Sequence, residues 1–178
     1  MAEAPTRYTT TAIALHWLMA LLIVAAFGLG LYMVDLKNSP QKLQYFSWHK
    51  WMGVTVFGLA AIRLMWRLFH KPPALPAMPM WQQRAAHGTH ILMYVLFFGI
   101  PLAGWLYSSA RGVQTVYFGI FPLPDLIEPD KSLASTLKQV HVYSGYVLAG
   151  LVSAHLAAVV KHQWLDKDGL LKRMIPGR

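Results

Sequence analysis

The residues with the clearest capacity for chemistry are histidines. The chain of 178 residues contains eight of them, and six fall in or beside long apolar segments. Polar side chains inside a membrane span are costly and usually functional. His70 and His162 are expected at the membrane surface in contact with water. The six that need an explanation are His16, His49, His87, His90, His141 and His155.

His141 and His155 lie 14 residues apart in one apolar segment. In an α-helix this separation is about 40° short of four full turns and covers about 21 Å along the axis. Both side chains therefore face the same side of the helix. One lies near the outer surface of the membrane and the other in its inner half.

Each of these histidines can be matched with a partner at its own depth. His16 lies about one turn into the first apolar segment, on the inner side, and His49 about one turn into the second, on the outer side. Depth therefore pairs His16 with His155 and His49 with His141. Each pair comes from two helices, so a flat macrocycle can fit between the rings. We predict two haem b groups whose irons are held by these four histidines.

Two glycines are placed to leave room for such a macrocycle. Gly53 follows His49 by four residues, and Gly145 follows His141 by four. Each lies one turn along the face of the predicted ligand. Glycine also occurs in membrane helices simply because it lets backbones approach each other.

His87 and His90 allow several interpretations. They lie three residues apart near the inner end of the third apolar segment, so they share a helical face. One of them could replace His16 as the inner ligand. They could also bind a haem propionate, contact a quinone or lie at the surface. Arg63 and Arg67, in the last turns of the second segment, are further candidates for propionate or quinone contacts.

Two further roles for the histidines stay open. They could bind a transported metal ion, or they could hydrogen-bond between helices and bind nothing. A metal transport site favours clustered ligands with carboxylates, and proton-driven transport also usually needs intramembrane carboxylates. The four apolar segments contain no Asp and no Glu. This composition favours haem over either kind of transport.

Three basic residues near the outer side suggest an electron donor. Lys138 lies one turn before His141 on the same face, Lys50 adjoins His49, and Arg111 opens the outer loop. A positive funnel attracts an anionic radical such as superoxide and raises its encounter rate. The same residues could instead neutralise haem propionates. Four acids on this side reduce its net charge to about +2, so long-range steering would be modest.

The elements that must position these residues are four apolar segments. A bilayer crossing needs about 20 residues, and the segments cover about residues 11–34, 46–68, 86–108 and 137–161. The chain is 56% hydrophobic and only 13% charged, whereas a soluble domain is typically about 25% charged. We predict an all-α membrane protein, a four-transmembrane-helix bundle that forms one domain over residues 1–178. The first segment is too long for a signal peptide and is interpreted as a retained span.

The charges indicate the orientation of the bundle. The net charge is +9, which in a soluble protein would suggest nucleic acid, but here the charges divide between two membrane faces. With the N-terminus inside, the outer face holds Lys37, Lys42, Lys50, Arg111, Lys131 and Lys138. The inner face holds the larger set: Arg7, Arg63, Arg67, Lys71, Arg84, Lys161, Lys167, Lys172, Arg173 and Arg178. We therefore predict that both termini are cytoplasmic and that the partner is the bilayer rather than nucleic acid.

The chain has no cysteine. Disulfides, thiolate zinc sites and iron–sulfur clusters are therefore excluded. Covalent haem attachment through C-x-x-C-H is excluded as well. Any haem is held by its axial ligands and by packing.

At these residues the sequence resembles the bacterial cytochrome b561 family of di-haem membrane proteins. The similar segments are A-L-H-W-L around His16, W-H-K-W-M-G around His49 and A-H-G-T-H-I-L-M-Y around His87 and His90. The spacing of the two histidines in the fourth segment and the tail K-D-G-L-L-K-R-M, residues 167–174, are also typical of the family. The resemblance covers nearly the whole chain.

The resemblance implies a four-helix bundle in the bacterial inner membrane with two non-covalent haem b groups stacked across it, held by the same four histidines. It also implies electron exchange with the quinone pool, with ubiquinone as a candidate, and at least one type of member oxidises superoxide at the outer face. The leading hypothesis is thus an oxidoreductase that carries electrons from an outer one-electron donor to quinone. The alternatives are a cytochrome b subunit that relays electrons for a periplasmic redox partner and a non-haem histidine transporter.

Overall fold

The computed structural model describes residues 7–76 and 78–177, and Arg178 of the charge count lies outside them. Four long helices dominate: α1 (Thr10–Val34), α2 (Pro40–Phe69), α3 (Met80–Ala110) and α4 (Lys131–Lys161). Each contains the corresponding predicted span and extends beyond it, while the membrane boundaries within each helix stay a prediction. All four helices are long and apolar enough to cross a membrane.

Three of the four long helices, α1, α2 and α4, begin where the sequence supplies a capping side chain. The Thr9 side chain accepts a hydrogen bond from Ala12 N at the start of α1, and the Ser39 side chain accepts one from Lys42 N at the start of α2. Asp130 accepts from two main-chain N–H groups at the start of α4. These side chains satisfy N–H groups that have no partner within the helix. Pro101 lies inside α3. Proline is tolerated in membrane helices because neighbouring groups can satisfy the carbonyl that loses its N–H donor.

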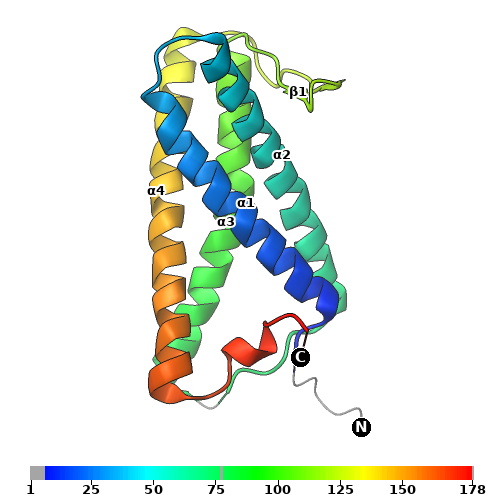
Figure 1. Cartoon of the computed structure of the whole chain (residues 1–178), viewed down its shortest axis with the longest axis vertical. Coiled ribbons are helices and arrows are strands. Elements are labelled where there is room, and N and C mark those ends of the chain that lie inside the picture. The colour runs from blue at the N-terminus through cyan, green and yellow to red at the C-terminus, as the bar shows by residue number, and fades with distance from the viewer. Residues whose placement is uncertain (1–6, 77, 178) are drawn as a thin grey trace.

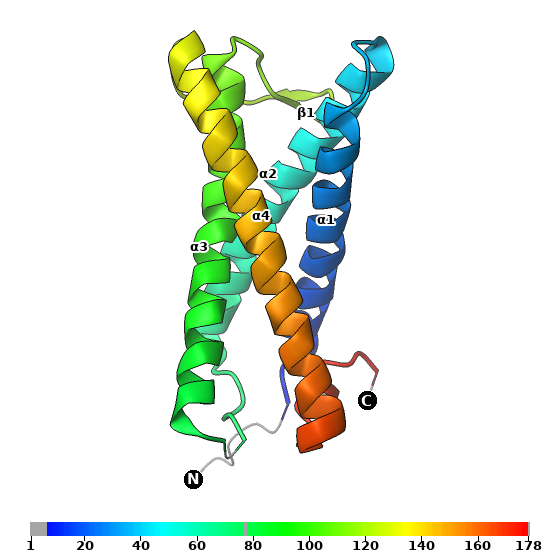
Figure 2. The same ribbon diagram turned by 90° about the vertical axis from the view of Figure 1, so that its left-hand side faces the viewer.

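The bundle is built from two helical hairpins (Figures 1 and 2). α1 packs against α2, α3 packs against α4, and α2 and α3 join the two pairs. The start of α1, the connection between α2 and α3 and the C-terminal segment all lie at one end (Figure 1). We call this the inner end, following the predicted orientation, and the opposite end the outer end.

The packed core lies midway along the bundle. It is a cluster with members from all four helices: Met19, Val56, Ala60, Met93, Phe97 and Leu148. Leu148 is seven residues from His141 and seven from His155. The apolar core therefore lies between the two levels at which histidines occur, and it divides the bundle into an outer and an inner half.

The outer loop contains the only two strands among the described residues. Two short antiparallel strands, β1 (Val116–Tyr117) and β2 (Phe121–Pro122), form a hairpin. Trp51 Nε1 of α2 donates a hydrogen bond of 2.7 Å to Val116 O, and the hydroxyls of Thr55 and Tyr117 lie 2.8 Å apart. The hairpin is thus fastened to the side of α2.

The C-terminal segment crosses the inner end. After α4 come a π-helix (His162–Asp166) and a 3₁₀ helix (Leu171–Arg173). We call residues 167–177 the C-terminal strap. Trp17 Nε1 donates to Met174 O at 2.7 Å, Arg7 donates to Ile175 O at 2.9 Å, and Arg173 donates to Ala74 O at 2.6 Å. The strap ties α1 to the connection between α2 and α3.

Candidate haem sites

The outer histidines face each other across the bundle. The ring centroids of His49 on α2 and His141 on α4 lie 5.8 Å apart, with an interplanar angle of 80°. Two imidazoles on opposite sides of one metal ion, with bonds of about 2 Å each, have centroids about 6 Å apart. The separation of this pair therefore suits one iron between the two rings.

Each outer ring is held by a main-chain carbonyl. His49 Nδ1 lies 3.0 Å from Ala26 O on α1, and His141 Nδ1 lies 2.9 Å from Ile100 O on α3. A carbonyl oxygen only accepts hydrogen bonds, so Nδ1 must be the donor in both rings. The neutral rings therefore carry their proton on Nδ1, and the lone pair of Nε2 is free to bind a metal.

Space beside both outer ligands matches the predicted role of two glycines. A Cβ added at Gly53 or at Gly145 would meet no atom within 4 Å. Both glycines lie one turn beyond a ligand on its own face. The open space, the free Nε2 atoms and the ring separation together show that the outer residues fit a haem.

The inner level brings three histidines together rather than two. His16 on α1 and His155 on α4 have ring centroids 6.4 Å apart at an interplanar angle of 69°. His90 on α3 lies nearer, 5.6 Å from His155 at 64°. The separation of His16 and His155 suits one iron, but His90 competes for the same ligand partner on distance alone.

Arg63 makes the inner site different from the outer one. Its Nη2 lies 3.1 Å from His16 Nδ1. Because a guanidinium has no acceptor, it must donate this bond, so the neutral His16 ring carries its proton on Nε2. Ligation through Nε2 therefore requires Arg63 to leave Nδ1. The inner residues fit a haem in depth and spacing, but only with this rearrangement.

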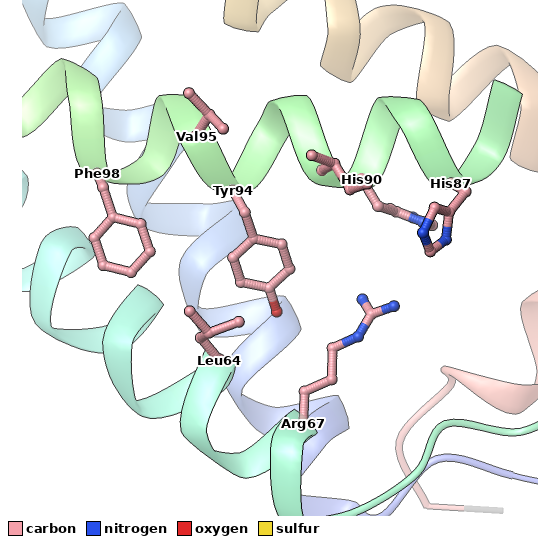
Figure 3. Close-up of a pocket in the computed structure, with 8 residues that line it drawn as sticks. Leu64, Arg67, His87, His90, Tyr94, Val95 and Phe98 are labelled. Carbon is pink, nitrogen blue, oxygen red and sulfur yellow. The ribbon is translucent and has the colours of Figure 1, made fainter. Parts of the chain in front are cut away.

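The remaining inner candidates line a cavity of about 410 Å³ between α2 and α3 (Figure 3). Arg67 extends from α2 toward His87 and His90 on α3, which form the polar end, and Tyr94 lies at the centre (Figure 3). The cavity is lined by Leu64, Arg67, His87, His90, Ile91, Tyr94, Val95 and Phe98. Arg63 is not part of this lining and lies 5.8 Å from the Tyr94 ring centroid.

The three outer basic residues do not converge on one point. Lys50 is half-buried, and its Nζ donates to Ser108 Oγ at 2.5 Å and to Val113 O at 3.4 Å. Arg111 and Lys138 are exposed. Asp125 and Glu128 line a second cavity of about 360 Å³ in the same loop region. The outer end therefore carries both signs of charge, and Lys50 already has protein partners.

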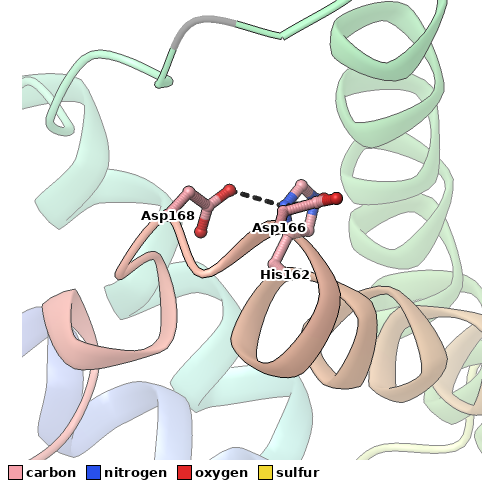
Figure 4. Close-up of side chains that lie close together, drawn as sticks. All are labelled: His162, Asp166 and Asp168. Carbon is pink, nitrogen blue, oxygen red and sulfur yellow. Dashed lines mark hydrogen bonds and ion pairs between the residues drawn. The ribbon is translucent and has the colours of Figure 1, made fainter.

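A cluster at the end of α4 was not expected from the sequence (Figure 4). His162 is half-buried rather than solvated, with Nδ1 2.6 Å from Asp168 Oδ2 and 3.1 Å from Asp166 Oδ2. Lys161 Nζ lies 2.5 Å from the same Asp166 oxygen. An ammonium at that position competes with any cation. The cluster therefore stabilises the start of the C-terminal strap. The four-residue spacing of His162 and Asp166 is the sequence feature that could have predicted their contact.

Comparison with known proteins gives matches along the whole described chain. A family model described as prokaryotic cytochrome b561 matches residues 7–177. Cytochrome b561 homolog 2 of Escherichia coli (strain K12) is 32% identical over 181 residues, which cover 97% of this chain and 93% of the relative. Cytochrome b561 homolog 1 of the same organism is 28% identical over 174 residues, covering 97% and 98%. The probable superoxide oxidase CybB of Yersinia pestis is 27% identical over 175 residues, covering 96% of each.

Proposed function

The chain belongs to the prokaryotic cytochrome b561 family, and we propose that it carries electrons through two haem b groups from an outer one-electron donor to a quinone at the inner end. Family membership confirms the predicted resemblance and, with the four apolar helices, the predicted fold class and a place as a multi-pass protein of the bacterial inner membrane. It supports transmembrane electron transfer and b-type haem. The number of haems, their ligands, the donor and the acceptor belong to the proposal.

The observation that carries the proposal is the presence of two facing histidine pairs on opposite sides of the apolar core. His49 and His141 hold the outer haem, and His16 and His155 hold the inner one. α4 supplies one ligand to each, and the ligands lie about 21 Å apart along its axis. When bound, haem supplies the one-electron redox chemistry, and the protein sets its position and environment.

At the inner site we assign Arg63 a second position. A carboxylate is a stronger acceptor for a guanidinium than a neutral ring nitrogen, because the hydrogen bond is between opposite charges. Arg63 would therefore leave His16 Nδ1 for a haem propionate, which frees His16 to bind through Nε2. His90, which faces His155 at 5.6 Å, remains beside the site and not on the iron.

The quinone site that we propose is the cavity between α2 and α3. Its walls are mostly apolar. Ile91 and Val95 are exposed on the side of the bundle that faces lipid. Arg67 and His90 provide hydrogen-bond donors for quinone oxygens at the polar end. His90 also connects this cavity to His155, so a quinone there would lie next to the inner haem.

The donor that we propose is a small anion, with superoxide as the leading candidate. Arg111 and Lys138 are exposed at the outer end, where positive charge raises the encounter rate of an anion. Each superoxide would lose one electron and leave as dioxygen. Two such electrons and two protons from the inner side would convert one quinone to a quinol. The comparisons support this chemistry through the name of one relative, which is called a probable superoxide oxidase.

The test of ligation uses purified His141→Ala and His155→Ala. Each variant should retain one haem per chain, because each loses a ligand of a different pair. His87→Ala, a change in the cavity lining on the same face as His90, serves as the control and should retain both haems. Loss of both haems in His87→Ala, or retention of both in His141→Ala, would refute the ligand assignment.

A further inference from the structure

The outer histidine rings reach carbonyls inside two neighbouring helices. Ala26 lies within α1 and Ile100 within α3. In an α-helix each carbonyl accepts a hydrogen bond from the N–H four residues later, so a second donor has to approach past the residue at that position. At both places that residue is a glycine: Gly30 follows Ala26 by four, and Gly104 follows Ile100 by four.

The rings occupy the space in which a side chain would begin. A Cβ added at Gly30 would lie 3.2 Å from Cε1 of His49. One added at Gly104 would lie 3.0 Å from both Cε1 and Nδ1 of His141. Carbon atoms pack best at about 3.5–4.0 Å, so either ring would have to move. By contrast, a Cβ at Gly28 or at Gly99, on the same two helices, would meet nothing within 4 Å.

We propose that Gly30 and Gly104 are positioning residues that set the ligand strength of the outer histidines. By lacking a Cβ they let the two rings dock on the Ala26 and Ile100 carbonyls. This contact fixes the proton on Nδ1, directs Nε2 into the bundle and makes the imidazole a more basic ligand. The inference rests on the proposed haem ligation and adds to it the residues that tune one of the two haems.

The consequence is a difference in potential between the two levels. A more basic axial ligand stabilises the oxidised iron and lowers the reduction potential of the outer haem. At the inner level Arg63, which lies 3.1 Å from His16 Nδ1 and would turn to a propionate when haem binds, keeps its positive charge beside the site, and a nearby positive charge favours the reduced iron. The outer haem therefore has the lower potential, and electrons move downhill from the outer end to the inner end.

The experiment is a redox titration of the purified holoprotein that resolves two haem components. In Gly104→Ala, the component that is lost in His141→Ala should shift about tenfold toward the reduced form, which is 59 mV for one electron. Gly30→Ala should shift it in the same direction by less, because its contact is looser. The pulsed EPR signal of the remote Nδ1 nitrogen should also change in the same variants. A general loss of packing would not change this signal.

The controls are Gly99→Ala and Gly28→Ala, at exposed positions on the same helices. Neither control should change the reduction potential of the outer haem. Selective loss of the outer haem in Gly104→Ala alone also supports the proposal, as its stronger form. An unshifted component in both Gly104→Ala and Gly30→Ala, or an equal shift in Gly99→Ala, overturns it. Wild-type protein with fewer than two haems would instead overturn the proposed function, so the two failures are distinguishable.

Discussion

At the scale of single residues, Arg63 separates the inner site from the outer one. It donates to His16 Nδ1, whereas the outer rings donate to carbonyls. This difference depends on the rotation and crossing of α1 and α2, which hydropathy and spacing do not encode. The sequence placed Arg63 among propionate and quinone contacts but could not show that it touches a predicted ligand.

We expect Arg63→Gln to lower the potential of the inner haem, because it removes a positive charge that favours the reduced iron. The shift should be about tenfold in the reduction equilibrium, or 59 mV for one electron. Redox titration measures it. Arg67→Gln is the matched control: it removes the same charge from the cavity lining, so it should weaken quinone binding, seen as a higher KM, and shift the inner potential less than Arg63→Gln does. An unchanged inner potential in Arg63→Gln would contradict the assigned role.

Outer charge can be tested in the same way. Lys138→Glu and Arg111→Glu should each lower the rate of superoxide-dependent quinone reduction by up to about tenfold at low salt, because they weaken the attraction of an anion. Added salt should reduce the difference from wild type. Lys131→Glu makes the same charge change about two turns before Lys138 on α4, farther from His141, and should lower the rate less than Lys138→Glu does. If all three variants keep the full rate, electrostatic steering plays no part.

At the scale of elements, the C-terminal strap is held by the cluster at the end of α4. Asp168 accepts from His162 Nδ1 and from Leu170 N. Removing a partner from such part-buried bonds costs about 1–3 kcal/mol. In Asp168→Ala we therefore expect trypsin to cleave at Lys172 and Arg173 about tenfold faster, since cleavage follows local opening. Lys161→Ala breaks only the exposed ion pair with Asp166, which contributes little, and comparable sensitivity in that control would refute this role.

The elements also show how far the sequence could be interpreted. Four long apolar runs were enough to predict α1 to α4, and the 14-residue spacing was enough to place His141 and His155 on one face. The helix ends extend beyond the apolar runs because capping residues such as Ser39 and Asp130 lie outside them. The β1–β2 hairpin was missed because its strands have only two residues each, too few for a periodic pattern.

The candidate site was predictable in part for the same reason. Depth along a helix follows from residue number, so pairing by level required no structure. Contacts between neighbouring helices depend instead on how each helix is rotated about its axis. The approach of His90 to His155 and the docking of His141 on Ile100 O are contacts of this kind. Gly53 and Gly145 could be singled out because each lies four residues from a predicted ligand on the same helix. Gly30 and Gly104 lie on other helices, so no sequence spacing relates them to a ligand.

At the scale of the whole molecule, both ends of the described chain lie at the inner end (Figure 1), which we predict from the charge bias to face the cytoplasm. The chain has no native cysteine, so single-cysteine variants report one site each. Exposed Ser132→Cys at the outer end should react with a membrane-impermeant maleimide in cells with a permeable outer membrane. Exposed Lys172→Cys should react only after the inner membrane is opened. The reverse pattern would invert the orientation.

The measurement that tests the central claim most directly is the haem content of the detergent-purified protein. A dithionite-reduced minus oxidised spectrum identifies the haem type, and a pyridine haemochrome assay gives the number per chain. We expect haem b at two per chain, because two facing histidine pairs lie on either side of the apolar core. One haem per chain would mean that one pair is not a ligand pair, and no haem in cells supplied with it would contradict the account entirely.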